Sequence, residues 1–195
     1  SKEIIKRQKL KFNLKKELIK HLGSDFKPNI YYIDHHLSHI SSAFYPSGFD
    51  QAAGLTIDGF GDFCSFTISE CSRKHIKIID KIFFPHSLGL FYEAFTQLIG
   101  FEKYGEEYKM MGLSSYGKPK YKDKILDNFF TNKNYKNLNL NFFNHHKRKF
   151  SYNFSGEPKQ NKIFNENAYN ILSLKDGQLS EIEIKDLACS CQCVF

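Results

Sequence analysis

Apolar residues recur every three or four positions at the start of the chain, which predicts an amphipathic helix over residues 3–22. One side of this helix carries isoleucines and leucines, and the other side carries lysines. Gly23 and Pro28 follow, and such residues are typical of a helix end. The next segment, NIYYID at 29–34, is rich in β-branched and aromatic residues, so we expect a short buried strand there.

A second helix is predicted directly after that strand. In HHLSHISSAFYP, Leu37, Ile40 and Phe44 form one apolar stripe, and Pro46 ends the pattern. Three strand-like segments joined by short turns come next, and they predict an antiparallel meander. These segments are AAGLTIDGFGDFCSFTISEC, which supplies two strands, and HIKIIDKIFF, which supplies the third. The helical pattern LGLFYEAFTQLIG is expected to cover the meander.

Beyond residue 120 the pattern is weaker. KYKDKILDNFF is compatible with a helix and NLNLNFF with a strand, while the Asn-rich stretch near 131–170 predicts a polar insertion or long connection. LSEIEIKDLACSCQCVF predicts a final helix. The whole is a mixed α/β domain. Because neither terminal helix has a cap or turn residue at the end of the chain, we expect the domain to be truncated at both ends.

Composition favours a globular protein, since 41% of the 195 residues are hydrophobic. No apolar run approaches the roughly 20 residues that span a bilayer, and the lysine-rich opening has no secretory signal core. The five cysteines form no CxxC pair, so we expect reduced thiols and a cytoplasmic protein. Cys189 and Cys193 share a helix face that Cys191 does not, which disfavours a soft-metal site.

The net charge of +7 lies almost entirely in residues 1–27, which hold nine basic and three acidic residues. A basic helix can bind a phosphate backbone, so a non-enzymatic nucleic-acid-binding module that uses Lys2 to Lys20 is one alternative function. Only Phe12 is interleaved with these lysines for base stacking. The pattern therefore favours a solvated helix face, and nucleic acid is not the expected partner.

The segment HHLSH offers the strongest chemical signal. His35 and His39 are four residues apart, so on a helix they lie roughly 40° apart around its axis and can share one metal ion. His36 falls between this side and the apolar stripe. Position 36 is not the glutamate that zinc proteases place there as a general base, so that chemistry is excluded. A third ligand is needed, and the carboxylate of Asp58, at the end of a predicted strand, is the best candidate.

Two glycine-containing segments are candidates for binding a nucleotide. In DGFGD, the amides of Gly59 and Gly61 could approach phosphate oxygens, although DG is also an ordinary hairpin turn. In GEEYKMMGLSSYGKPKY, a charged helix end precedes a glycine-containing loop, and a solvated helix end explains it equally well. The candidate residues for catalysis are His36, Glu107 and Lys109, and those for cofactor binding are Asp58, Gly59, Gly61, Gly112 and Gly117.

Three segments in series carry a family resemblance. HHLSHISSAFYPSGFDQAAGLTIDGFGD, FPHSLGLFYEAFTQLIGF and EYKMMGLSSYGKPKY resemble the O-carbamoyltransferases of nodulation-factor and aminoglycoside-antibiotic biosynthesis, over roughly residues 30–122. The resemblance implies part of an actin, sugar-kinase and chaperone-ATPase (ribonuclease H-like) fold. Residues 1–50 would end the first half of its carbamoyl-transfer domain and 51–195 would begin the second half.

The family resemblance also implies a reaction. A further domain, absent from this chain, makes carbamoyl adenylate from carbamoyl phosphate and ATP, and the first domain passes the carbamoyl group to a hydroxyl of a small molecule or sugar. A divalent metal, Fe²⁺, is held by residues that correspond to His35, His39 and Asp58, together with an aspartate that has no counterpart here. On this basis the chain alone is not expected to be active. A transfer-RNA threonylcarbamoyl-type relative and a homodimer remain open alternatives.

Overall fold

The computed structural model describes residues 13–131, 136–147, 152–153, 159–175 and 177–195. The chain divides into two compact units, residues 1–34 and 35–195. In the first unit residues 13–22 are helical, and the Gly23 N–H donates to the Ile19 carbonyl at 2.9 Å, with the Gly23 φ at 98°. The predicted helix end at Gly23 is therefore confirmed, while residues 1–12 lie outside the described part.

The strand expected at 29–34 is wrong, because this segment has no regular secondary structure in the described chain. Its apolar side chains face solvent: Tyr31 is 82% exposed and Ile33 is 64% exposed. β-Branched and aromatic residues favour a strand only where a neighbouring strand and a packed face are present. The composition of residues 29–34 indicates a preference for strand structure, but it does not indicate whether a neighbouring strand is present.

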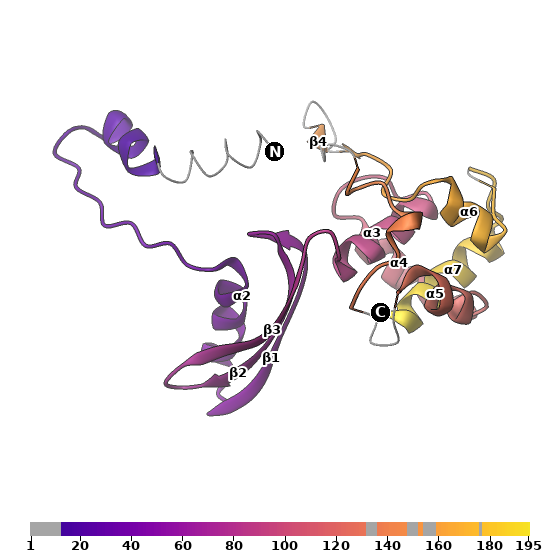
Figure 1. Cartoon of the computed structure of the whole chain (residues 1–195), viewed down its shortest axis with the longest axis horizontal. Helices are drawn as coiled ribbons and strands as arrows, with labels where there is room; N and C mark the ends of the chain where they lie inside the picture. The colour runs from indigo at the N-terminus through magenta and orange to yellow at the C-terminus, as the bar shows by residue number, and fades with distance from the viewer. Residues whose placement is uncertain (1–12, 132–135, 148–151, 154–158, 176) are drawn as a thin grey trace. The chain divides into compact units, whose positions relative to one another are not determined.

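The predicted meander is confirmed. Its strands are β1 (Gln51–Gly61), β2 (Cys64–Ser72) and β3 (Ile76–Phe83), paired antiparallel in the order β1-β2-β3 (Figure 1). The turn between β1 and β2 is made by Asp62 and Phe63, whose φ values of 51° and 67° are typical of a two-residue hairpin turn. Most of DGFGD thus belongs to β1. The register shifts between Ile57 and Gly61, so the expected tight turn is in fact an irregular strand end.

Helix α2 (His35–Phe44) packs against β1 and β2, and a 3-10 helix η1 (Tyr45–Ser47) containing Pro46 follows it, as predicted. Ile40, Phe44 and Cys71 form a small buried cluster between helix and sheet. A side chain at Gly54 would lie 2.8 Å from the Cys71 sulfur and 2.9 Å from Ile40 Cδ1, so this glycine allows helix and strand to approach. This packing determines the distance between α2 and β1.

The larger core is helical. It contains α3 (Leu88–Leu98), α4 (Glu107–Ser114), α5 (Lys122–Phe129), α6 (Glu166–Leu172) and α7 (Glu181–Val194). The helix α3 packs against β1 and β2 of the meander, as expected, and it also packs against α4 and α7, so it is buried on nearly all sides. The helix α2 packs against the same two strands. Among the described helices none is long and apolar enough to cross a membrane.

The Asn-rich segment contributes to this core. The expected strand at NLNLNFF is present only as isolated bridges, Phe130 with Leu138 and Phe143 with Phe164, around a 3-10 helix η2 (Leu140–Phe142). A two-stranded sheet, β4 (Tyr152–Asn153) with β5 (Lys159–Gln160), follows. Buried side chains from the segment are Leu138, Phe143, Ile163, Phe164 and Ala168. The sequence analysis missed this contribution because these residues have no regular spacing.

The final helix is confirmed as α7. Ser180 caps its amino end, where the Ser180 and Glu183 side chains form a reciprocal capping box. Cys191 is fully buried, whereas Cys193 on another side of the helix is exposed, as helical spacing predicted. All five cysteines are free thiols.

Candidate metal centre

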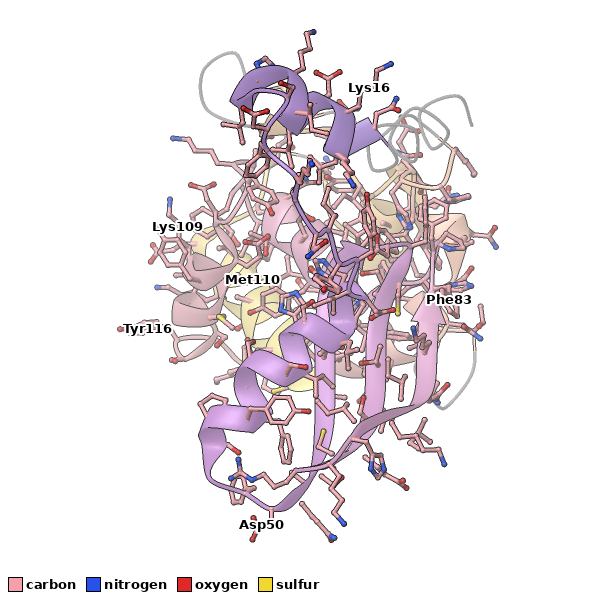
Figure 2. The ribbon with its side chains drawn as sticks, turned by 90° about the vertical axis from the view of Figure 1, so that its left-hand side faces the viewer. Lys16, Asp50, Phe83, Lys109, Met110 and Tyr116 are labelled. Atoms are coloured by element: carbon pink, nitrogen blue, oxygen red, sulfur yellow. The ribbon has the colours of Figure 1, made fainter. Side chains whose placement is uncertain are left out.

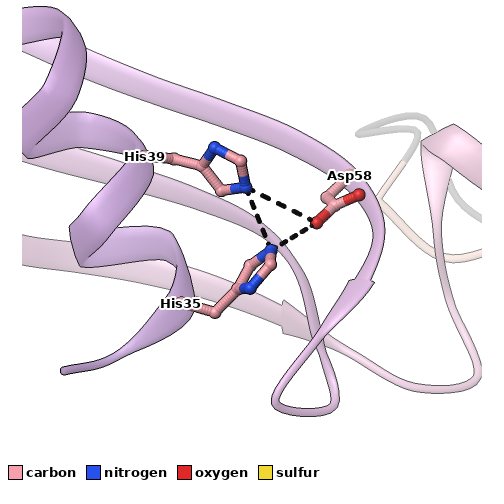
Figure 3. Close-up of side chains that lie close together, drawn as sticks. All are labelled: His35, His39 and Asp58. Carbon is pink, nitrogen blue, oxygen red and sulfur yellow. Dashed lines mark hydrogen bonds and ion pairs between the residues drawn. The ribbon is translucent and has the colours of Figure 1, made fainter. Parts of the chain in front are cut away.

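Two elements bring His35, His39 and Asp58 together, the histidines from the first turns of α2 and the aspartate from β1 (Figure 3). His35 Nε2 lies 2.7 Å from Asp58 Oδ2 and 3.0 Å from His39 Nε2. His39 Nε2 lies 3.8 Å from Asp58 Oδ2. The two imidazoles and the carboxylate therefore point at a common position.

The donor set fits a divalent transition metal. A circle through three atoms separated by 2.7, 3.0 and 3.8 Å has a radius of about 1.9 Å, close to the roughly 2.0–2.2 Å of bonds from a metal to nitrogen or oxygen. Two imidazoles with one carboxylate suit iron or zinc. The side chains of His35, His39 and Asp58 are 40%, 55% and 33% exposed, so one side stays open to further ligands. Within the described residues no other group of three has this arrangement.

His36 lies apart from this group. It is only 1% exposed, its Nδ1 lies 2.7 Å from Thr56 Oγ1, and its Nε2 lies 2.9 Å from the Cys64 carbonyl oxygen. The sequence analysis placed His36 between the two sides of the helix, but the structure places it on the buried side with Ile40 and Phe44. Both ring nitrogens are occupied and shielded from solvent, which disfavours a role as a proton acceptor for substrate.

The two glycines of the strand end contact or make room for the candidate metal ligands. A Cβ atom at Gly61 would overlap the His35 ring, so only glycine leaves room for this imidazole. The Gly59 N–H donates to Asp58 Oδ1 at 2.7 Å, which leaves Oδ2 for the histidines. Both residues were expected to present amides to a phosphate, and in this structure the Gly59 amide is engaged by Asp58.

The start of α3 holds the strand end from the other side. Ser87, 1% exposed, directs its hydroxyl to the carbonyl oxygens of Asp58 at 3.0 Å and Gly59 at 2.8 Å, and accepts the Leu90 N–H at 3.1 Å. A Cβ at Gly89 would lie 2.5 Å from the Asp58 carbonyl oxygen. The helix cap and a close backbone approach thus fix the main chain at Asp58.

Comparison with known proteins identifies the family of the chain. Residues 2–194 match the family described as Carbamoyltransferase N-terminus. The chain belongs to the carbamoyltransferase family. The resemblance found in the sequence is confirmed by this match, which extends over nearly the whole chain.

Relatives of this carbamoyltransferase chain include two nodulation proteins. NolNO of Sinorhizobium fredii is 38% identical over 114 residues, which is 58% of this chain and 17% of NolNO. NolO of Bradyrhizobium diazoefficiens is 38% identical over 100 residues, 50% of this chain and 18% of NolO. An uncharacterized protein of Synechocystis sp. is 44% identical over 120 residues, 60% of this chain and 20% of that protein. The chain therefore spans about a fifth of the length of these relatives.

The charged residues of the carbamoyltransferase chain's third motif lie on α4. Lys109 forms an ion pair with Glu106 at 2.5 Å, and its ammonium lies 5.3 Å from the centre of the Phe101 ring. Tyr116 points away from the molecule (Figure 2), Lys109 is half-buried, and Met110 is fully buried. Glu107 is half-buried. None of these residues belongs to the metal-ligand group.

The glycines of the third motif differ from each other. A Cβ at Gly117 would overlap the Lys185 carbonyl of α7, and the next residue, Lys118, donates its N–H to Asp186 Oδ1 at 2.8 Å. Gly117 thus allows the loop to pack against α7. At Gly112 a Cβ would meet no atom within 4 Å. The structure accordingly gives Gly117 a packing role, and Gly112 faces open space.

Sequence reasoning missed Glu93, a half-buried carboxylate on the mostly apolar α3. It lies one helical turn after Gly89, on the side of α3 that meets Asp58. Burial, together with the neighbouring Glu107 carboxylate, raises the pKa of Glu93 to about 8. The available signal was a single acid within the apolar run LGLFYEAFTQL, which a pattern search for paired motifs does not detect.

Proposed function

We propose that this chain is part of an enzyme that transfers a carbamoyl group from carbamoyl adenylate to a hydroxyl of a small molecule or sugar, with a divalent metal, Fe²⁺, at the His35–His39–Asp58 group. The observation that carries the proposal is the convergence of these three side chains, in the carbamoyltransferase family, at the end of β1. The mixed α/β architecture is compatible with the ribonuclease H-like fold that we expect for the complete domain. The five free thiols fit a cytoplasmic location.

The reaction forms one carbon–oxygen bond and breaks another. The acceptor hydroxyl oxygen bonds to the carbamoyl carbon, the bond from that carbon to the adenylate phosphate breaks, and AMP leaves with the electron pair. The hydroxyl proton passes to a base. An adenylate-forming domain elsewhere in the protein would make the carbamoyl adenylate. Water would release phosphate from carbamoyl phosphate, and an oxygen of the resulting carbamate would attack the α-phosphorus of ATP and displace pyrophosphate.

A divalent ion bound by the three ligands would supply Lewis acidity that polarises the carbamoyl carbonyl or the phosphate of the adenylate. The chain's own residues prepare this position. Gly59 holds one oxygen of the Asp58 carboxylate, and Gly61 admits the His35 ring. Of the three catalytic candidates from the sequence, His36 is enclosed and Lys109 is paired with Glu106, so Glu107 is the remaining candidate to receive the hydroxyl proton.

An assay of the full-length protein with ATP, carbamoyl phosphate and a panel of hydroxyl acceptors tests this proposal. We expect carbamoyl-dependent pyrophosphate release and a carbamoylated acceptor. Asp58→Ala should lower transfer by at least about 100-fold, since it removes a side chain that binds the metal directly, and should leave pyrophosphate release intact. Asp50→Ala, which removes a carboxylate that is 94% exposed, is the matched control. Absence of carbamoyl-dependent pyrophosphate release in the wild type would refute the proposed function.

A further inference from the structure

Three buried polar side chains lie beside the metal-ligand group, one from each of α2, β1 and β2. They are His36, Thr56 and Thr67, which are 1%, 8% and 0% exposed. Burying a hydroxyl or an imidazole is unfavourable unless each polar atom has a hydrogen-bond partner. Here every one of these side chains has such a partner, so the group is a complete hydrogen-bonded network.

The directions of the hydrogen bonds follow from the chemistry of the groups. The Cys64 carbonyl can only accept, so His36 Nε2 carries the proton and donates to it at 2.9 Å. In the neutral imidazole Nδ1 then has a lone pair, and it accepts the Thr56 hydroxyl at 2.7 Å. Thr56 Oγ1 in turn accepts the Thr67 hydroxyl at 2.7 Å. With a neutral imidazole at His36, this is the single arrangement of protons that satisfies the network.

The network links the same two elements as the metal ligands do. His36 follows the ligand His35 on α2, and Thr56 precedes the ligand Asp58 by two residues on β1. The bond from His36 to Thr56 thus joins α2 to β1 beneath the half-exposed contact of His35 with Asp58. Any slip of the helix along the strand would break the inner bond and also separate the outer pair.

We infer that His36, Thr56 and Thr67 are positioning residues that hold the α2 ligands at the correct distance from Asp58, so that the three donor atoms are arranged before a metal binds. The inference rests on the metal site of the proposed function and deepens it. Groups that orient metal ligands in this way change metal affinity by about 10 to 100-fold when they are removed. His36 contributes through Thr56 and Asp58, without contact to the metal or the substrate.

The test compares Thr56→Val with Thr56→Ser in the full-length protein, using Co²⁺ as the probe and its visible absorption as the readout. Valine keeps the shape of threonine and removes the hydroxyl, while serine keeps the hydroxyl. We expect Thr56→Val to weaken Co²⁺ binding about 10 to 100-fold and Thr56→Ser to restore most of it. Thr67→Val, one bond further from the ligands, should weaken binding by a smaller factor and serves if Thr56→Val does not fold.

Ser69→Ala is the matched control. Ser69 is 1% exposed on the same sheet and has a side-chain oxygen with no hydrogen-bond partner within the described part of the chain, so its removal should leave Co²⁺ affinity unchanged. Nitrogen NMR of the wild type should show His36 protonated at Nε2. Folded Thr56→Val and Thr67→Val proteins with wild-type Co²⁺ affinity would overturn the inference, as would a His36 protonated at Nδ1.

The outcomes separate this inference from the proposed function. If Co²⁺ binds and depends on Thr56 but no carbamoyl group is transferred, the proposed reaction fails and the positioning role stands. If carbamoyl transfer occurs and the Thr56 variants bind Co²⁺ with wild-type affinity, the positioning role is refuted and the proposed reaction stands. A wild-type protein that binds no Co²⁺ overturns both the metal assignment and the inference.

Discussion

For single residues, the distances between the donor atoms of His35, His39 and Asp58 determine what the end of β1 can bind. His35, His39 and Asp58 converge because Gly61 has no side chain where the His35 ring lies. Asp58 uses one carboxylate oxygen for the Gly59 amide and the other for His35. This division fixes the carboxylate in the orientation that the two imidazoles share.

The three ligands are expected to be individually necessary for metal binding. His35→Ala, His39→Ala and Asp58→Ala should each weaken metal binding by more than about 100-fold, because loss of a ligand exceeds the effect of losing an orienting group. Elemental analysis of the purified full-length variants measures this. His21→Ala, which removes a 73% exposed histidine, should retain the wild-type metal content. A metal-replete His35→Ala would contradict the ligand assignment.

Comparing Gly61→Ala with Gly59→Ala tests whether the room for the His35 ring affects metal affinity. A methyl group at Gly61 must displace the His35 ring, so we expect metal affinity to fall by at least about 10-fold although all ligands remain. A methyl group at Gly59 would meet no atom within 4 Å and should leave metal affinity near the wild-type value. Isothermal titration with Co²⁺ distinguishes them. Equal affinities in the two variants would show that the His35 position is not restricted by Gly61.

At the scale of elements, the ligand-bearing strand is held between two helices. α2 lies along β1 and contributes the histidines, and the amino end of α3 holds the Asp58 and Gly59 carbonyls through Ser87. The same hydroxyl caps α3 by accepting the Leu90 N–H. Helix capping and strand placement therefore depend on one buried side chain.

Ser87→Ala is expected to destabilise the protein more than removal of an exposed cap. It leaves the Leu90 N–H and two carbonyls without their partner, so the cost should be about 2–3 kcal/mol. Ser180→Ala removes the capping box of α7 at the surface and should cost about 1 kcal/mol. Urea unfolding of both variants measures the difference. Equal losses would mean that the Ser87 contacts to β1 contribute nothing to stability.

At the scale of the whole molecule, the second unit has a small core between α2 and the sheet and a larger helical core. The helix α3 belongs to the larger core and reaches β1 at its amino end. Glu93 on this helix is the acid whose pKa is raised to about 8 by burial and by Glu107. Its burial makes the stability of the fold depend on pH.

The direction of that dependence follows from proton binding. Between the ordinary pKa of 4.5 and the folded pKa of about 8, the unfolded chain releases the Glu93 proton that the folded chain keeps. Raising the pH through this window therefore lowers stability, by at most about 1.4 kcal/mol per pH unit. Glu93→Gln should remove this contribution and be more stable than the wild type at pH 8, as measured by thermal unfolding. Glu70→Gln, at an exposed position of β2, should not change the pH profile.

The sequence by itself determined the features that depend on local periodicity. These are the helix that carries His35 and His39 on one side, the three-stranded meander and the final helix. The closeness of Asp58 to both histidines was also expected from its place near a strand end. The family was also recognisable from three motifs in their order. Each helix, each strand and each motif rests on residues close together in the chain, where spacing and side-chain chemistry are sufficient.

Other features became known only from the tertiary structure: the burial of His36, the conformation of residues 29–34 and the role of the Asn-rich segment. His36 is buried because its partners Thr56 and Cys64 come from strands 20 and 28 residues away, which helix spacing cannot indicate. The segment 29–34 forms no strand, since strand pairing requires a neighbour that composition does not supply. The Asn-rich segment fills the helical core through irregularly spaced apolar residues. Burial and pairing depend on contacts between distant residues, and these are settled only when the chain has folded.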